Sequence, residues 1–207
     1  GEAYIPVVEG IGTGVENFAQ QIDSIILDGQ PVSEIKNAGV YTVNMLITAT
    51  GFKDTIMTAT ITVNPTPFNL AVYRQSINYD GNGHGIDGSG DAKDYIYVSG
   101  SGSRVAYSDI MIIYILTDGS KIGGYPYRDG KYYVANSDDT LTDVEAELPK
   151  NATSYSYYAV YNPQNAIETV NPQNYAYTTS DSASLVINPI TVRVTLLFDK
   201  KEYIEGS

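Results

Sequence analysis

The stretch NAGVYTVNMLITATGFKDTIMTATITVNP, residues 37–65, decides the fold of this chain. Apolar and polar side chains alternate along it in two runs, and Thr50-Gly51 lies between them. A period of two with many Val, Ile and Thr residues is typical of half-buried antiparallel strands, and a Thr-Gly pair between such runs marks a turn. We therefore expect a hairpin with one apolar face. That face is formed by Tyr41, Val43, Met45, Ile47, Ala49, Met57, Ala59, Ile61 and Val63.

The same alternation returns in residues 190–198 (ITVRVTLLF), where Ile190, Val192 and Val194 share one face. Pairs such as Asp118-Gly119 separate the other runs. Many short alternating runs with frequent turns predict an all-β protein built from antiparallel β-sandwiches.

One segment near the N-terminus competes with this pattern. Residues 15–25 carry apolar side chains at helical spacing, which is compatible with a short helix. The interpretation that we prefer is a loop followed by a strand from Ile22 to Leu27 that ends at Asp28-Gly29.

A repeat relates the two ends of the chain. ITVNPTPFNLAV (61–72) resembles LVINPITVRVTL (185–196), and the prolines Pro65 and Pro189 lie 124 residues apart. Because proline donates no ladder hydrogen bond, we interpret Asn-Pro as a junction between tandem modules. This predicts a compact module over 1–65 and a larger one over 66–207.

The repeat is also compatible with two other divisions of the chain. If the strands after each proline close the preceding module, the boundary moves to near residue 78. If they open the next one, residues 190–207 begin a third repeat.

Composition excludes several classes of protein. The 207 residues carry a formal charge of −12, no cysteine and a single histidine. Disulfides, thiolate metal sites and multi-histidine centres are therefore excluded, and nucleic-acid binding is not expected from such an acidic chain. The longest apolar run, of 7 residues from Ile110 to Leu116, is far shorter than the ~20 residues that cross a bilayer.

Residues 37–65 resemble the closing half of bacterial immunoglobulin-like repeats, with an Ala-Gly-x-Tyr-Thr-Val strand, a Gly-aromatic turn and a Thr/Ala-alternating last strand. Asn78-Tyr79-Asp80-Gly81 resembles the opening of the YDG or MBG type of these repeats. The resemblance implies tandem immunoglobulin-like modules of a secreted or surface-anchored bacterial protein. It also implies a structural or adhesive role without catalysis, with neighbouring repeats as partners. Residues 85–150 depart from the pattern and are interpreted as an insertion.

The glycine-rich stretch DGNGHGIDGSGD, residues 80–91, is the first candidate site. Its oxygen-bearing side chains alternate much as in a Ca²⁺-binding loop, with the Ile86 carbonyl at the seventh position. His84 at the fifth position departs from that pattern, and a hairpin loop built on Asp and Asn turns is the alternative. The candidate ligands are Asp80, Asn82, Asp87, Asp91 and Asp94.

Clustered tyrosines in the second half of the chain are the second candidate. Tyrosine offers rigid amphipathic contact area, so a surface that binds a host glycan or protein is one interpretation, and packing between strands is the other. The candidate ligand-binding residues are Tyr125, Tyr127, Tyr155 and Tyr157.

Weaker candidates complete the set. The acidic run between Asp138 and Glu147 is expected to be a solvated loop rather than a cation site. Lys36, Lys53, Lys121 and Lys131 are the lysines to examine for an intramolecular isopeptide bond. Catalysis is not expected, because a Ser-His-Asp triad would depend on His84 alone and the nucleophile-elbow and phosphate-loop motifs are both missing.

Overall fold

The computed structural model describes residues 2–7, 18–100 and 104–195. Strands dominate these ranges, and the helical segments among them are 3-10 turns of three residues, so the all-β prediction is confirmed. The strands are β1 (Ala19–Leu27), β2 (Gln30–Val32), β3 (Gly39–Thr48), β4 (Thr55–Val63), β5 (Phe68–Val72), β6 (Gln75–Asn78), β7 (Ile96–Gly100), β8 (Ile110–Ile115), β9 (Lys121–Gly124), β10 (Tyr132–Ala135), β11 (Leu141–Ala146), β12 (Ser154–Tyr161), β13 (Thr178–Thr179) and β14 (Ala183–Asn188).

Strands β1 to β4 form one antiparallel sheet in the order β2-β1-β3-β4, which we call module one. The turn from β1 to β2 is Asp28-Gly29, where both residues have positive φ, 49° and 79°. Two such residues in a two-residue loop match the right-handed twist of a hairpin, which explains why this pair stops β1. The strand predicted from Ile22 to Leu27 is confirmed as the last part of β1, which begins earlier, at Ala19. The alternative of a helix over 15–25 is wrong for its described part. Residues 15–17 lie outside the described residues.

The core of module one is thin. Val43, Tyr41 and Ile35 are almost fully buried, but Met57 is 50% exposed and most of β4 faces solvent. Met57 pairs with Met45, so it lies on the face that the sequence predicted to be apolar. Its side chain is nevertheless half exposed, which the sequence did not predict. Among the described residues no second sheet covers this end of the face.

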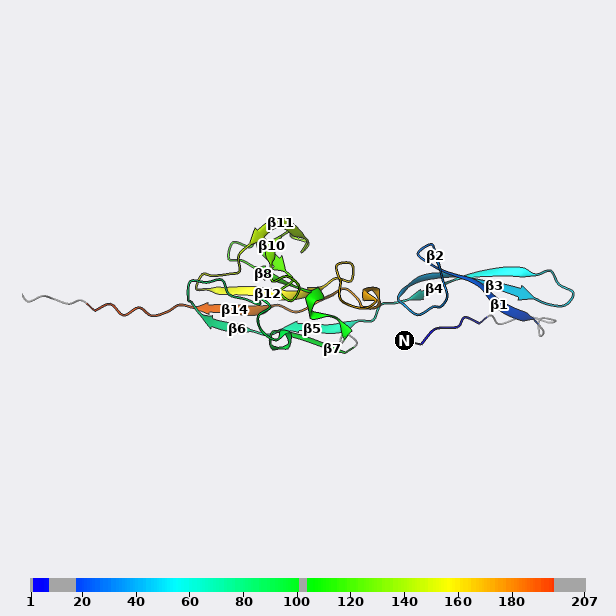
Figure 1. Ribbon diagram of the computed structural model, residues 1–207, viewed down its shortest axis with the longest axis horizontal. Coiled ribbons are helices and arrows are strands. Elements are labelled where there is room, and N and C mark those ends of the chain that lie inside the picture. The colour runs from blue at the N-terminus through cyan, green and yellow to red at the C-terminus, as the bar shows by residue number, and fades with distance from the viewer. Residues whose placement is uncertain (1, 8–17, 101–103, 196–207) are drawn as a thin grey trace, which may run out of the picture.

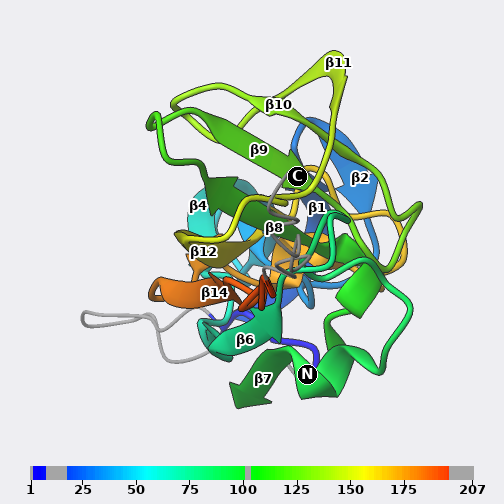
Figure 2. The ribbon, with the colours of Figure 1, turned by 90° about the vertical axis from the view of Figure 1, so that its left-hand side faces the viewer.

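Strands β5 to β14 form module two, which is layered (Figures 1 and 2). Its main sheet has the order β11-β10-β9-β8-β12-β14-β6, with β13 beside β12, and a second sheet pairs β5 with β7. Phe68 and Leu70 of β5 pack into the same core as Tyr157 and Leu185 of the main sheet. The change from one core to the other thus falls between β4 and β5.

Strand β8 is buried on both faces. Ile110, Ile112 and Tyr114 point into the main core, whereas Met111 and Ile113 point to the opposite face. The continuous apolar run that the sequence shows here is therefore a central strand with two covered faces. Its second face matters for function because a hollow lies there.

The two modules meet through Asn174, which ends the 3-10 turn η4 (Pro172–Asn174). Its side-chain oxygen accepts a hydrogen bond from Ala38 N at 2.6 Å, and its Nδ2 donates to Asn37 Oδ1 at 3.0 Å. Its backbone oxygen accepts from Thr66 N at 2.8 Å, just after the Asn64-Pro65 junction. One residue of module two therefore binds both module one and the connecting segment.

The modules lie one after the other along the long axis of the molecule (Figure 1). Residues 190–195 continue beyond β14 in extended form and leave at the end of module two that faces away from module one. The expected strand over 190–198 is unpaired in its described part, and residues 196–207 lie outside the described residues. Among the described residues, no helix is both long and apolar enough to cross a membrane.

Candidate functional site: a hollow on the second face of module two

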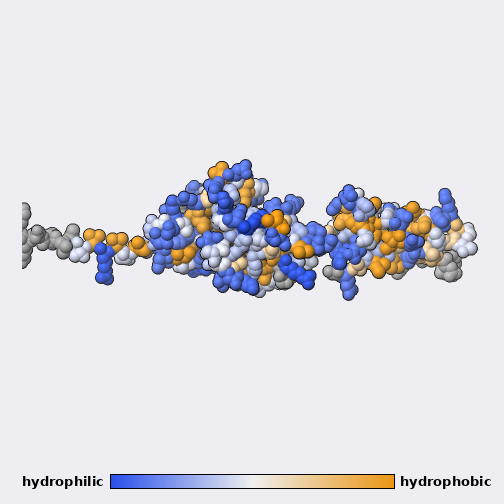
Figure 3. Space-filling view, in the orientation of Figure 1, coloured by the Kyte–Doolittle hydropathy of each residue, from blue (hydrophilic) through white to orange (hydrophobic). Residues whose placement is uncertain are grey.

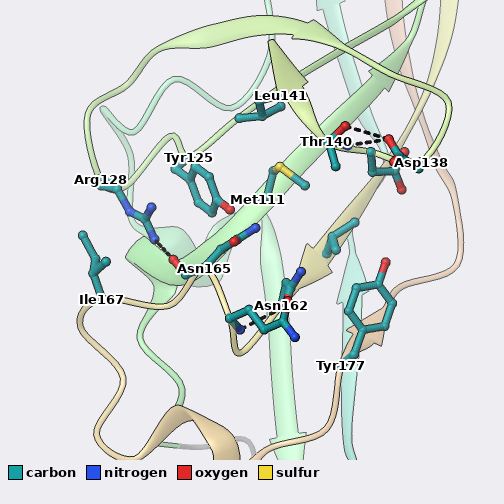
Figure 4. Close-up of a pocket in the computed structure, with 13 residues that line it drawn as sticks. Met111, Tyr125, Arg128, Asp138, Thr140, Leu141, Asn162, Asn165, Ile167 and Tyr177 are labelled. Atoms are coloured by element: carbon teal, nitrogen blue, oxygen red, sulfur yellow. Dashed lines mark hydrogen bonds between the residues drawn. The ribbon is translucent and has the colours of Figure 1, made fainter. Parts of the chain in front are cut away.

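A hollow of about 550 Å³ lies on the face of the main sheet opposite the large core (Figure 4). Met111 of β8 and Val160 of β12 form its apolar floor, both nearly buried. Loops form the walls, because three connections converge above these two strands. The residues that line it are Met111, Tyr125, Arg128, Asp138, Asp139, Thr140, Leu141, Val160, Asn162, Gln164, Asn165, Ile167 and Tyr177.

Arg128 and Asp109 hold one wall in place. Arg128 Nη2 donates to Asp109 Oδ1 at 2.9 Å and to the Asn165 carbonyl at 3.1 Å, while its Cζ lies 3.9 Å from the centre of the Tyr125 ring. A guanidinium stacked on an aromatic ring and paired with a carboxylate is held rigidly. The orientation of Tyr125 therefore depends on Arg128, which also lines the hollow, and through Arg128 on Asp109, which lies outside it.

Asp109 is a buried carboxylate whose oxygens are occupied by hydrogen bonds from neighbouring groups. It accepts hydrogen bonds from the backbone N–H groups of Ile167 at 2.8 Å and Thr169 at 2.6 Å, besides the Arg128 pair. Burial raises the pKa of Asp109, but the bonds from Ile167 and Thr169 outweigh it and hold this pKa below its ordinary value. A charged Asp109 therefore fixes the loop after β12 that forms one wall.

The opposite wall is fixed by Lys121, Asp139 and Tyr158. Lys121 Nζ donates to Asp139 Oδ1 at 2.7 Å and to Tyr158 OH at 3.0 Å, and Tyr158 OH donates to the same Asp139 oxygen at 2.6 Å. The hydrogen bond to Asp139 raises the pKa of Lys121 well above its usual value. The side-chain partners of Lys121 among the described residues are Asp139 and Tyr158 and include no asparagine, which an isopeptide bond would require.

The other three lysines offer no such bond either. Lys36 pairs with Glu34 at 3.4 Å and Lys131 pairs with Glu145 at 3.5 Å, both on the surface. Lys53 lies in the exposed turn before β4. The acidic run from Asp138 to Glu147 has ordinary structural roles. Asp139 and Glu145 belong to these ion pairs, Asp138 forms a turn, and other acidic side chains occupy exposed positions of β11.

The four tyrosines predicted to bind a ligand are not brought together. Tyr125 lines the hollow. Tyr155 is 5% exposed, Tyr157 is 0% exposed and Tyr127 packs against the large core. The prediction is therefore corrected for Tyr157, which is completely buried, and Tyr155 is a core residue that lies away from the hollow of Tyr125. Tyr177, which is 55% exposed at the rim, is the aromatic residue that the sequence did not single out.

The buried tyrosines instead secure loops over the core. Tyr114 and Tyr157 stack with ring centroids 5.1 Å apart. Their hydroxyls reach backbone: Tyr114 OH accepts from Ile86 N at 2.8 Å, and Tyr157 OH donates to the Tyr73 carbonyl. A tyrosine can fill a core and satisfy a buried backbone group at the same time, which explains the choice of tyrosine over phenylalanine here.

The glycine-rich stretch is one of these secured loops and does not assemble the expected Ca²⁺ site. Ile86 is fully buried, and its carbonyl, the seventh-position ligand of the expected loop, accepts a hydrogen bond from Tyr132 OH. Gly88 has φ +82°, and a Cβ there would collide with the Pro126 carbonyl. The glycines thus permit close backbone approach around the anchored Ile86.

The carboxylates of this loop make turns. Asp80 accepts from Asn82 N at 2.8 Å, Asp87 from Ser89 N at 2.9 Å and Asp91 from Lys93 N at 3.0 Å. Asp94 lies in the 3-10 turn η1 (Ala92–Asp94). Across the described ranges, no three carboxylate or histidine side chains gather closely enough to hold a metal ion. The five residues predicted as ligands are therefore better explained as turn formers.

Comparison with known proteins adds no family to this picture. The chain matches no protein-family model, and no curated protein is significantly similar to it.

Proposed function

We propose that this chain is a pair of non-catalytic, immunoglobulin-like β-modules that act as a structural or adhesive segment of an extracellular bacterial surface protein. The observation that carries the proposal is the junction. Asn174 bonds Asn37 and Ala38 of module one and Thr66 of the connecting segment, so the modules are held in series. The first described residues lie beside the junction end of module one, where Tyr4 N donates to the Ile35 carbonyl, and the described chain leaves at the far end of module two (Figure 1).

The absence of cysteine does not argue against this location. Bacterial surface modules can be stabilised by their cores, and module two has a large one built on Tyr114, Tyr157 and Tyr161. The threonines of exposed strands such as β4 add polar surface without adding charges. Antibodies raised against the chain should therefore label intact cells of its source. Labelling that appears only after lysis would contradict the extracellular assignment.

Small-angle X-ray scattering tests the series arrangement. The unmodified chain should scatter as one elongated particle of fixed shape. Asn174→Ala removes both side-chain bonds to module one, so the junction should loosen and the scattering should require an ensemble of angles. Asn69→Ala, at an exposed position of β5, is the matched control and should leave the curve unchanged. A freely hinged ensemble for the unmodified chain would overturn the proposal.

A second candidate function is recognition of a carbohydrate in the hollow of module two. Its apolar floor of Met111 and Val160 suits the C–H face of a sugar ring, and Asn162, Asn165 and Thr140 offer hydrogen bonds at the walls. This is the chemistry of a neutral polyhydroxylated ligand. It favours a soluble or cell-surface glycan over a charged metabolite.

A glycan array with two tyrosine variants tests this candidate. Tyr177→Ala removes the exposed aromatic ring at the rim and should reduce binding at least tenfold. Tyr97→Ala removes a similarly exposed ring on β7, which does not line the hollow, and should leave binding unchanged. An array without any specific ligand, or equal losses for both variants, would reject the hollow as a glycan site.

A further inference from the structure

A second cavity, which we call the junction cavity, lies where the two modules meet, beside the hydrogen bonds of Asn174. Its volume is about 490 Å³, within the roughly 300–1,000 Å³ of small-molecule sites, and such sites often lie between domains. Figure 3 shows mainly hydrophilic surface in the narrow region between the modules. The lining includes Lys36 and Asn37 of module one and Arg104, Asn171, Asn174 and Tyr175 of module two.

Positive charge gathers at the junction cavity although the chain is acidic. The sequence has 24 acidic and 12 basic residues, yet Lys36 and Arg104 line this cavity and no acidic residue of the described chain does. Arg104 is exposed and makes no hydrogen bond or ion pair to another described residue. Lys36 lies 3.4 Å from Glu34 Oε1, but both side chains are half exposed, and such surface pairs contribute little. Both cations are therefore available to an anionic group.

Buried neighbours fix the backbone positions of both cations. Lys36 follows Ile35, which is 1% exposed, and Arg104 precedes Val105, which is 5% exposed. Ile35 belongs to the core of module one and Val105 to the large core of module two. Each cation is therefore carried by a different packed core, so a ligand that binds there does not have to order the backbone first.

Asn171 has a strained backbone at the junction cavity. Its φ of 49° and ψ of 61° are left-handed, which few residues other than glycine adopt, and the following Pro172 biases its predecessor towards extended conformations. Asn171 caps the turn η4, but its side chain makes no cap hydrogen bond, so the turn does not use the amide. Strained residues cluster at ligand-binding sites, and this amide has no partner among the described residues.

Tyr175 adds a hydroxyl to the lining. Its ring packs edge-on against Phe68 and Tyr161, with centroid distances of 6.4 Å and 6.5 Å, so the large core fixes its position. Its hydroxyl makes no hydrogen bond to any residue in the described ranges. Hydroxyl and amide groups both donate and accept hydrogen bonds, as the hydroxyls of a sugar require. An inorganic anion engages the cations alone, whereas a sugar with an acidic group engages the cations, Asn171 and Tyr175 together.

We propose that the junction cavity binds a saccharide that carries a carboxylate or a sulfate. Arg104 and Lys36 hold the acidic group, and Asn171 and Tyr175 bind the sugar hydroxyls. The inference rests on the proposed serial arrangement of the modules, because the lining residues come from both of them. A ligand that contacts both modules favours the arrangement in which they are docked, so binding also stiffens the junction.

NMR titration of the full chain tests the ligand class. Glucuronic acid and galactose 6-sulfate are compared with glucose, galactose and inorganic sulfate. At least one acidic sugar should shift the amide resonances of Asn171 and Tyr175 and should bind about tenfold more tightly than its neutral counterpart. Equal binding of acidic and neutral sugars would overturn the proposal. Inorganic sulfate that binds as tightly as the acidic sugars would also overturn it, because the cavity would then recognise an anion without the sugar.

Variants that each remove one charge locate the site. Arg104→Gln and Lys36→Gln should each weaken binding of the acidic sugar about tenfold, because a charge-assisted hydrogen bond is lost. Arg193→Gln and Lys53→Gln remove the same kinds of charge at exposed positions that do not line the cavity, and they should leave binding unchanged. Equal losses in all four variants would indicate non-specific attraction and would reject the site.

Small-angle X-ray scattering separates a failure of this site from a failure of the serial arrangement. In Asn174→Ala, whose junction is loosened, the acidic sugar should bind more weakly, and saturation with it should narrow the range of angles between the modules. A rigid unmodified chain that binds neither acidic sugar would refute the site alone. A freely hinged unmodified chain, measured before any ligand is added, would refute the serial arrangement. An Asn174→Ala ensemble that saturation leaves unchanged would show that the sugar contacts only one module, and the bridging site would be wrong.

Discussion

Module one and module two are both antiparallel sheets, but their apolar faces are covered to different extents. In module one the buried core consists of five residues, and the outer strand β4 is mostly exposed. In module two sixteen buried residues lie between two sheets, and β8 is covered on its second face as well. Because burial of apolar area is the main stabilising term, we expect module two to hold most of the stability and module one to open more easily.

Tyr157→Ala should produce the largest effect, because it removes a fully buried ring at the centre of the larger core. Loss of the side chain, its stack with Tyr114 and its bond to the Tyr73 carbonyl should lower the free energy of unfolding of module two by about 4 kcal/mol. Hydrogen exchange read peptide by peptide separates the modules. Faster exchange in β8 and β12 with unchanged exchange in β3 is expected, and equal acceleration in both would contradict independent cores.

Asp109→Asn should come next, with a loss of about 3 kcal/mol at pH 7, because Arg128 is left without its charged partner. The folded pKa of Asp109 lies below its ordinary value, so the charged form stabilises the folded state above about pH 4. This contribution disappears as pH falls through the folded pKa. The difference in unfolding free energy between the two proteins should therefore shrink from pH 6 to pH 3, and a constant difference would reject this role.

The hollow depends on the same aspartate. Asp109 fixes the backbone of Ile167 and Thr169, and Arg128 fixes Tyr125, so Asp109→Asn should loosen the wall after β12 as well. This arrangement could not be foreseen from the sequence. Asp109 and Arg128 lie 19 residues apart without a motif, and their pairing arises only when the turn before β8 meets the loop after β9.

The alternation of apolar and polar residues correctly predicted which side chains share one face of a strand. It did not predict whether another layer of the protein covers that face. The side chains expected on one face of β3 and β4 do share that face, yet Tyr41 is buried while Met57 is half exposed. Alternation with a period of two indicates only which side chains point to the same face of a strand. Whether another layer lies above them depends on distant parts of the chain, which local patterns do not contain.

The same limit explains the two site predictions that changed. Tyr155 and Tyr157 share the predicted strand parity, but the β5 and β7 sheet covers that face, and so they belong to the core. The glycine-rich loop has the spacing of a Ca²⁺ loop, and its single large apolar residue, Ile86, was the available signal that it packs inward.

Met45→Ala and Met57→Ala compare a buried and an exposed residue of one cross-strand pair in module one. Met45 is 5% exposed, and its truncation should lower the free energy of unfolding of module one by roughly 2 kcal/mol, the low end for a core position, because the thin core can relax. Met57→Ala should change it by less than about 0.5 kcal/mol. Urea unfolding followed by hydrogen exchange in β3 measures both. Equal losses would show that β4 is covered in solution.

Tyr114→Phe should have a smaller effect than Tyr157→Ala, Asp109→Asn or Met45→Ala, because the ring remains and only the hydroxyl is lost. Its removal leaves the buried Ile86 N–H without the bond of 2.8 Å that it makes to Tyr114 OH. An unpaired buried donor costs about 1–3 kcal/mol, and we expect about 1.5 kcal/mol here. The change should appear as faster exchange around Ile86, while the exchange of β12 stays nearly constant. Tyr133→Phe, whose ring is only half-buried on β10, is the control and should leave that loop unaffected. If the loop around Ile86 exchanged at the same rate in Tyr114→Phe, Tyr114 would be a packing group alone. The anchoring of the glycine-rich loop would then have to come from the Tyr132 hydroxyl and from the burial of Ile86.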